Sequence, residues 1–166
     1  MIQTRRAQGA DAPALLELVE ALAHYERLPP PDRLARKRLI ADLFGERPRM
    51  EAYLAESDRR IVGYALVFET YSSFLALPTL YLEDLFVLPE SRSRGAGAAL
   101  FRHVVRQAQQ RGCGRVEFAV LGWNDLAREF YFRFGARQMQ EWQLFRLERT
   151  EIQAIAEGPA DNSSSV

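Results

Sequence analysis

Two arginines and two glycines near residue 95 form a segment that could hold a phosphate group. The segment reads SRSRGAG at 91–97, and the apolar run after it has helical spacing. Glycine lets the backbone approach an oxyanion closely, and the first turn of a helix presents unpaired amides. Arg92 and Arg94 add charged donors. The alternative is a solvated loop whose small residues allow close helix packing, and these residues alone favour neither.

Two common nucleotide motifs do not fit this segment. A dinucleotide fold needs G-x-G-x-x-G, or a final Ala, directly after a strand, whereas Leu100 occupies that last position. A P-loop needs Lys and then Ser or Thr after the glycines, and neither follows here. The pattern that remains is R-x-x-G-x-G, formed by Arg92, Gly95 and Gly97 at the start of a helix.

Two carboxylates and one tyrosine could move protons. Glu83 and Asp84 interrupt the apolar stretch TLYLEDLFVL at 79–88, where adjacent strand positions face opposite sides. A lone carboxylate at a strand end is usually solvated, but two adjacent ones between leucines are harder to dismiss. Tyr131 lies among phenylalanines. Without other evidence for a catalytic role, packing in the core is the better interpretation of this residue.

The composition limits the class of protein. The chain has 166 residues and is 48% hydrophobic, which predicts a single domain over 1–150 and a small polar tail over 151–166, partly disordered. There are 22 basic and 22 acidic residues, so the total charge does not indicate a nucleic-acid partner. Neither a signal peptide nor an apolar run long enough to span a bilayer is evident, which predicts a cytoplasmic protein without a membrane partner.

Cysteine and histidine give no metal or nucleophile pattern. The single cysteine, Cys113, excludes a disulfide framework and a cysteine-rich metal site within one chain. An acyl-cysteine intermediate would need an adjacent activating base, and none is evident. His24 and His103 lack metal-ligand spacing, so we expect no metal.

The elements that must position these residues follow from hydrophobic periodicity and capping signals. Polar residues 57–59 separate two strands and predict a hairpin. Asp11, Asp32 and Asn124 are expected helix caps. The predicted order is β-α-α-β-β-β-α-β-α-β-β, a mixed α/β sheet flanked by helices. We predict strands at 2–7, 50–57, 60–71, 79–88, 115–120, 136–140 and 142–149, and helices at 12–27, 32–44, 95–111 and 124–134.

Four segments in fixed order extend the argument: LAHYE at 22–26, FGERP at 44–48, YLED at 81–84, and the WN-to-FY run at 123–131. With the glycine loop, they resemble the GNAT superfamily of acyl-CoA-dependent N-acetyltransferases. Within it they resemble the diamine (spermidine/spermine) and thialysine acetyltransferase branch, over nearly the whole chain. The resemblance implies a mostly antiparallel sheet, acetyl-CoA as cofactor with coenzyme A as product, a homodimer, and a small-molecule primary amine as acceptor.

The resemblance also implies catalytic roles. An alkylammonium with a pKa near ~10.4 has no free lone pair at neutral pH. Glu83 would attract the amine and take its proton through water. Tyr131 would be the general acid that protonates the departing thiolate, because a phenol with a pKa of about 10 still carries its proton at neutral pH.

Binding roles are implied in the same way. A splay or bulge near 85–87 would aim an amide at the thioester carbonyl. The residues implied to bind acetyl-CoA are Leu85, Phe86 and Val87 on a strand, Arg92, Ser93, Arg94, Gly95, Ala96, Gly97 and Ala98 in the loop, and Asn124, Ala127 and Tyr131. Those implied to bind the acceptor are Tyr25, Glu26, Glu83, Asp84 and Trp142.

Several of these assignments have plain alternatives. Asn124 could only cap its helix, Glu26 could be a surface charge, and Trp142 could pack in the core. Ser72 and Phe74 stand where the diamine branch carries an acidic residue and a Trp. This departure weakens the case for a long polyamine and keeps a lysine analogue open. The remaining alternatives are acetylation of a protein or peptide amine, and a non-catalytic acyl-CoA-binding sensor.

Overall fold

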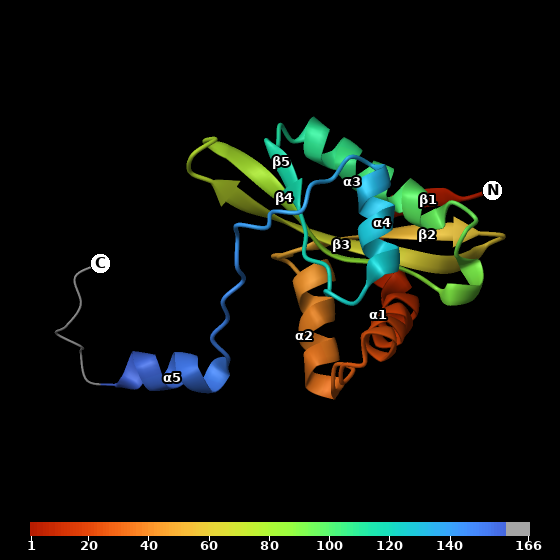
Figure 1. The fold of residues 1–166 in the computed structure, drawn as a ribbon. Helices are drawn as coiled ribbons and strands as arrows, with labels where there is room; N and C mark the ends of the chain where they lie inside the picture. Colours follow the sequence, from red (N-terminus) through yellow and green to blue (C-terminus); the bar gives the residue numbers. More distant parts are fainter. Residues whose placement is uncertain (159–166) are drawn as a thin grey trace. The chain divides into compact units, whose positions relative to one another are not determined.

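The computed structural model describes residues 1–158, which fall into two compact units (Figure 1). The first unit is Met1–Ala119 and the second is Val120–Val166. The predicted extent of a single domain, 1–150, stays a prediction. The expected disorder at 159–166 lies outside the described residues.

The first unit is built on a five-stranded sheet in the order β1-β2-β3-β4-β5. Neighbouring strands from β1 to β4 are antiparallel, and β5 pairs with β4 in parallel. The strands are β1 Gln3–Arg6, β2 Glu51–Ser57, β3 Arg60–Ser72, β4 Leu77–Val87 and β5 Arg115–Glu117. The predicted mixed, mostly antiparallel sheet is confirmed, and so is the hairpin at 57–59.

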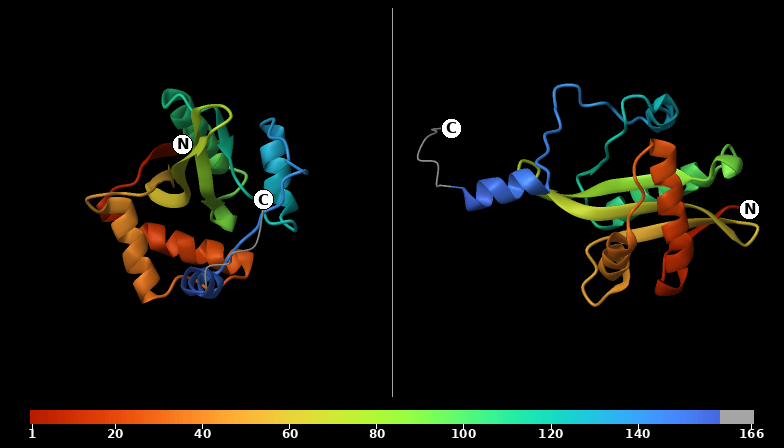
Figure 2. Two further views of the ribbon diagram at one scale, coloured as in Figure 1. Left: turned by 90° about the vertical axis from the view of Figure 1, so that its left-hand side faces the viewer. Right: turned by 90° about the horizontal axis from the view of Figure 1, so that it is seen from below.

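Helices cover both faces of this sheet. Helices α1 (Ala12–Glu26) and α2 (Arg33–Phe44) lie on one face, and α3 (Ala96–Gln110) lies on the other (Figures 1 and 2). Short 3-10 helices at Gly9–Asp11 (η1) and Pro89–Ser91 (η2) precede α1 and α3. The core between the sheet and α1 contains Leu15, Leu18, Leu54, Tyr64 and Phe86.

The capping predictions for the first two helices have different outcomes. Asp32 caps α2, because its carboxylate accepts a hydrogen bond from the Ala35 amide at 2.7 Å. Asp11 stands at the N-cap of α1 but makes no capping bond to that helix. Its carboxylate instead accepts from the Gln8 amide and pairs with Arg5 at 2.7 Å. The position of Asp11 was predicted correctly, and its partner was not.

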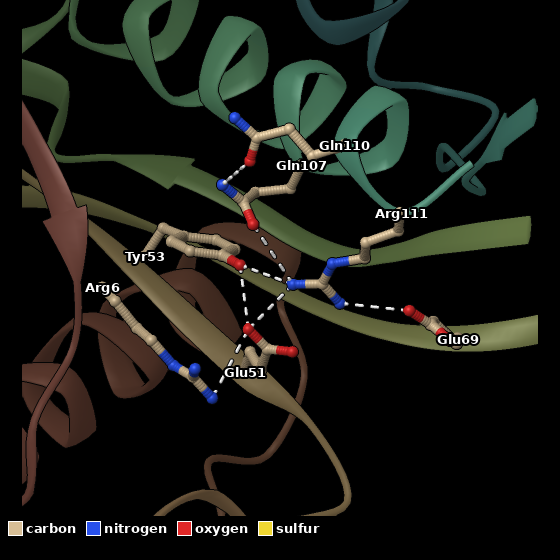
Figure 3. Close-up of polar contacts among 7 residues, drawn as sticks. All are labelled: Arg6, Glu51, Tyr53, Glu69, Gln107, Gln110 and Arg111. Atoms are coloured by element: carbon tan, nitrogen blue, oxygen red, sulfur yellow. Dashed lines mark hydrogen bonds and ion pairs between the residues drawn. The ribbon is translucent and has the colours of Figure 1, made fainter. Parts of the chain in front are cut away.

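A polar network fixes the carboxyl end of α3 to the sheet (Figure 3). The Arg111 guanidinium donates to Glu51 at 2.9 Å and to the Tyr53 hydroxyl at 2.9 Å, and pairs with Glu69 at 3.4 Å. Arg6 pairs with the same Glu51 carboxylate at 3.5 Å. Burial and the neighbouring Glu51 raise the pKa of Tyr53 to about 12. Because α3 begins at the glycine loop, this network also sets where the loop lies on the sheet.

The second unit contains helices α4 (Asp125–Arg133) and α5 (Arg149–Glu157). Within its described residues it has no strand, so the strands predicted at 136–140 and 142–149 are wrong. Their alternating polar and apolar residues suit a strand, but a strand also needs a neighbour to pair its backbone groups. Residues 149–157 form a helix where a strand end and a polar tail were predicted.

Candidate active site

Strands β4 and β5 separate halfway along β4. They are paired from Thr79–Arg115 to Tyr81–Glu117 and no further, and β5 is shorter than the predicted 115–120. Beyond Tyr81, β4 stays paired with β3 up to Val87. Among residues 1–158, the other edge of this part of β4 has no strand partner. This edge is therefore open to pairing with an extended ligand, as if to an added strand.

The main chain presents alternate residues to that open edge. The Leu88 amide donates to the Val62 carbonyl at 2.9 Å, so Leu88 faces β3. In an antiparallel ladder the direction alternates, so the polar groups of Val87 and Leu85 point to the open edge. The Val87 carbonyl accordingly accepts from Arg92 Nε at 3.0 Å. By the same alternation the backbone of Phe86 faces β3, and its side chain is buried in the core, so the expectation that Phe86 presents main-chain groups to a cofactor is wrong.

A β-bulge separates the two adjacent carboxylates. Leu66 lies opposite Asp84 while Val67 lies opposite Leu82, so Glu83 is an extra residue on β4. A splay or bulge was expected near 85–87: the bulge lies just before that segment, and β4 has already separated from β5 there. Bulges re-aim side chains next to active sites. Here Glu83 is exposed, whereas Asp84 is partly buried on the face covered by α1.

Asp84 has a hydrogen-bond partner that sequence reasoning missed. The hydroxyl of Tyr64, a fully buried side chain, donates to Asp84 Oδ2 at 3.1 Å. Burial raises the pKa of Asp84 to about 6, and the charges of Glu83 and Glu26 act in the same direction, against the Tyr64 hydrogen bond. Tyrosine in an apolar strand is ordinary core composition, and its partner is 20 residues away. No local signal therefore indicated the pair.

The end of α1 brings a third acidic residue toward Asp84. Glu26 is the last residue of α1, and burial raises its pKa. The charge of Glu26 contributes to the raised pKa of Asp84. The surface-charge alternative for Glu26 is therefore incomplete, because this carboxylate is partly withdrawn from water and belongs to the electrostatic environment of Asp84.

The glycine loop has the geometry of an open helix start. Gly95 is the N-cap of α3 and has φ +89°, with no side-chain capping bond. A Cβ there would meet nothing within 4 Å, so the backbone angle and not the available space favours glycine. The first helical bond runs from the Ala99 amide to the Gly95 carbonyl at 2.9 Å. The amides of 96–98 come before it, at the positive end of the helix.

Arg92 links this loop to the end of α1. Its guanidinium carbon lies 4.6 Å from the centre of the Tyr25 ring and 5.7 Å from that of Phe86. Together with the bond to Val87, these contacts hold the Arg92 side chain beside the open edge of β4. Ser93 has a positive φ of 60°, and Arg94 is exposed.

The remaining predicted site residues lie in the second unit. Asn124 caps α4 as predicted, because its Oδ1 accepts from the Ala127 amide at 3.1 Å. Tyr131 is buried, with its ring centre 5.1 Å from that of Phe130. Trp142 is 75% exposed, so the alternative that it packs in the core is wrong. The structure thus brings Tyr25, Glu26, Glu83, Asp84 and the glycine loop together in the first unit, and Asn124, Ala127, Tyr131 and Trp142 belong to the second.

Comparison with known proteins identifies the family to which the chain belongs. The model of the Acetyltransferase (GNAT) family matches residues 14–136. The chain belongs to this family. It is an N-acetyltransferase, and GNAT enzymes use acetyl-CoA as a cosubstrate.

Relatives support the same assignment. The acetyltransferase is 32% identical to a thialysine N-epsilon-acetyltransferase of Bos taurus, over 93% of this chain and 97% of the relative. It is 40% identical to an L-ornithine N5-acetyltransferase of Arabidopsis thaliana, over 69% of this chain and 51% of that protein. A crystal structure of a probable acetyltransferase shares the fold, with a TM-score of 0.78, 22% identity, and coverage of 88% of this chain and 97% of the other. Within residues 1–158, no helix is both long and apolar enough to cross a membrane.

Proposed function

We propose that this acetyltransferase moves the acetyl group of acetyl-CoA to a primary amine of a small molecule, by direct attack of the amine. The open edge of β4, which leads into the uncapped first turn of α3, is the observation that supports this most directly. The open edge of β4 matches an extended arm that contains amides. The first turn of α3 matches a pyrophosphate.

The cofactor would be held mainly by main-chain groups. Leu85 and Val87 would pair with the pantetheine arm through their outward-facing polar groups. The amides of 93–98 would bind the pyrophosphate, with Arg92 and Arg94 as charged donors. Acetyl-CoA supplies the thioester carbonyl and a thiol leaving group. The protein need only align that carbonyl with the amine, because alignment removes most of the entropic barrier to reaction.

Two side chains would handle protons and charge. Glu83, exposed at the bulge, would attract the acceptor ammonium and help remove its proton through water. Tyr131 would deliver a proton to the departing thiolate, which leaves more easily once protonated. In this proposal no covalent acyl-enzyme forms, so Cys113 has no role.

The acceptor would be a diamine, a polyamine or a lysine analogue. The charges of Glu26 and Glu83 act on Asp84, and this local concentration of negative charge suits a cationic acceptor. The relatives are named for thialysine, ornithine and spermidine or spermine, all of which are amines. Ser72 and Phe74 depart from the diamine pattern and favour the amino-acid side-chain amines among these.

Thiol release from acetyl-CoA, measured with lysine analogues, ornithine, polyamines and peptides, tests the proposal. We expect turnover with free amines and little with peptides. Activity on peptides alone would move the assignment to a protein acetyltransferase. Tight cofactor binding without turnover on any amine would favour the acyl-CoA-binding sensor and contradict the proposal.

A further inference from the structure

The bulge in β4 gives its two adjacent carboxylates different surroundings. Glu83 is exposed to water, where its charge is screened. Asp84 lies opposite Leu66 and two positions from Phe86, on the face that packs against α1. One carboxylate can therefore attract a cation from solution, while the other can hold a proton in a drier place.

Tyr64 is built into the sheet in a way that fixes Asp84. Its side chain is fully buried between β3 and α1, and its ring centre lies 6.4 Å from that of Phe86. Its hydroxyl reaches Asp84 Oδ2 at 3.1 Å. A buried phenol locked by packing holds its hydroxyl in one place, so it also restricts the carboxylate that accepts from it.

The charges that face Asp84 come from each element around it. Glu83 lies on the same strand, Glu26 at the end of α1, and Tyr64 on β3. The Arg92 guanidinium is stacked on the Tyr25 ring and does not contribute to the shift of the Asp84 pKa. Burial and the two glutamates raise the pKa of Asp84 to about 6, against the Tyr64 hydrogen bond. A base is most effective when its pKa lies near the working pH.

We infer that Asp84 is the group that finally takes the proton of the acceptor ammonium, and that Tyr64 is the positioning residue for Asp84. The inference rests on the proposed function. The two carboxylates then have different roles: Glu83 attracts the acceptor ammonium, and Asp84 accepts its proton. An N–H bond of the ammonium breaks, its electron pair stays on nitrogen, and the proton forms an O–H bond on Asp84, directly or through water.

The matched pair Tyr64→Phe and Tyr53→Phe tests the role of Tyr64. Each removes one buried hydroxyl that donates to a carboxylate, Asp84 at 3.1 Å or Glu51 at 2.9 Å. The readout is the pH profile of kcat/KM for ornithine or a lysine analogue. In Tyr64→Phe we expect the acid limb to move to higher pH, because the hydrogen bond that lowers the pKa of Asp84 is gone. The affinity for acetyl-CoA should stay unchanged, and Tyr53→Phe should lose stability without moving the limb.

Two further variants separate Asp84 from Glu83. Asp84→Asn should abolish the acid limb and lower kcat by about 10²-fold or more, as expected for loss of a general base. Glu83→Gln should raise KM for the amine and keep the limb. The inference is overturned if the limb disappears in Glu83→Gln and persists in Asp84→Asn, or if it stays in place in Tyr64→Phe.

A titration without turnover distinguishes this inference from the proposed function. The carboxyl carbon of Asp84, assigned by its loss in Asp84→Asn, should titrate near pH 6 by NMR, and at higher pH in Tyr64→Phe. Equal midpoints in the two proteins would overturn the role of Tyr64 even if the enzyme is active. Absence of turnover with every amine would instead defeat the proposed function, and the proton-accepting role of Asp84 with it.

Discussion

At the scale of single residues, the ionised Asp84 carboxylate lowers the free energy of unfolding. Its pKa is raised to about 6 in the folded chain, against an ordinary value of ~3.9 for an unfolded aspartate. The folded state therefore binds the proton more tightly, and the contribution of Asp84 to stability falls as the pH rises from about 4 to about 6. Retaining such a group is typical of a functional site.

Asp84→Asn should therefore stabilise the protein while it lowers kcat. We expect a gain on the order of 2 kcal/mol in the free energy of unfolding at pH 7. Urea unfolding at pH 7 and at pH 4 measures it, and the gain should shrink at the lower pH. An equal gain at both values would show that the charge of Asp84 is not its cause.

The role of Gly95 in binding coenzyme A can also be measured directly. Its φ of +89° costs an alanine roughly 1–2 kcal/mol, although a Cβ would have room. Gly95→Ala should weaken coenzyme A binding about tenfold, since the loop must change its backbone to relieve the strain. Gly9→Ala is the matched control, because its Cβ also meets nothing within 4 Å and it lies outside the loop. Equal affinities of both variants in calorimetry would contradict the role of the loop.

The sequence predicted the types of these residues better than their surroundings. Glu83 and Asp84 stood out because they interrupt an apolar run. Which of them is buried depends on the bulge opposite Leu66 and Val67, and strand register depends on pairing that no single segment contains. Tyr64 was missed for the same reason, since only the folded sheet brings its hydroxyl to Asp84.

At the scale of elements, the network at the end of α3 anchors that helix. Burial opposes ionisation of Glu51, but hydrogen bonds from Arg111 and Tyr53 outweigh it and hold the pKa of Glu51 below its ordinary value. A carboxyl group with a lowered pKa stabilises the fold above its unfolded pKa. This contribution should be lost as the pH falls below about 4.

Arg111→Ala should lower the free energy of unfolding by about 1–3 kcal/mol at pH 7, because it removes the nearer of the two cations that pair with a partly buried carboxylate and leaves only the longer pair with Arg6. The loss should shrink as the pH falls through the lowered pKa of Glu51, because protonation of this carboxylate removes its ion pair with Arg111 in both proteins. Arg146→Ala serves as the control, since its pair with Glu148 is 3.8 Å long and exposed. Equal effects of both substitutions in thermal unfolding would rule out the anchoring role.

The elements themselves were predictable where local signals define them. Asp32 and Asn124 mark helix starts through capping bonds, and the turn at 57–59 marks a hairpin. The strands predicted at 136–140 and 142–149 are absent because alternation alone cannot supply a pairing partner. The resemblance implied a splay or bulge near 85–87, but no local signal indicates where the pairing of β4 with β5 stops.

At the scale of the whole molecule, the family assignment rests on more than one segment. The family match covers residues 14–136, which includes all but the first two residues of α1, the strands β2 to β5, and the helices α2, α3 and α4. The resemblance that first indicated the family drew on motifs spread over the same range. The family match and the motifs therefore cover the same part of the sequence, which includes residues of both units.

A homodimer stays a prediction at this scale. It follows from the resemblance, and the exposed Trp142 and Phe145, 75% and 87% accessible in one chain, are large apolar side chains that a second copy could cover. Sedimentation at micromolar concentration should give twice the mass of one 19.0 kDa chain. A single-chain mass at that concentration would contradict the prediction.

The central claim is acetyl transfer from acetyl-CoA to a small primary amine with Tyr131 as the acid. The most direct test is thiol release with ornithine or a lysine analogue by the wild-type enzyme and by Tyr131→Phe, with coenzyme A affinity measured on both. We predict turnover by the wild type, a loss of about 10²-fold or more in the variant, and similar affinities. Equal turnover by both proteins would contradict the assigned acid, and no turnover by the wild type with any amine would contradict the acetyl transfer itself.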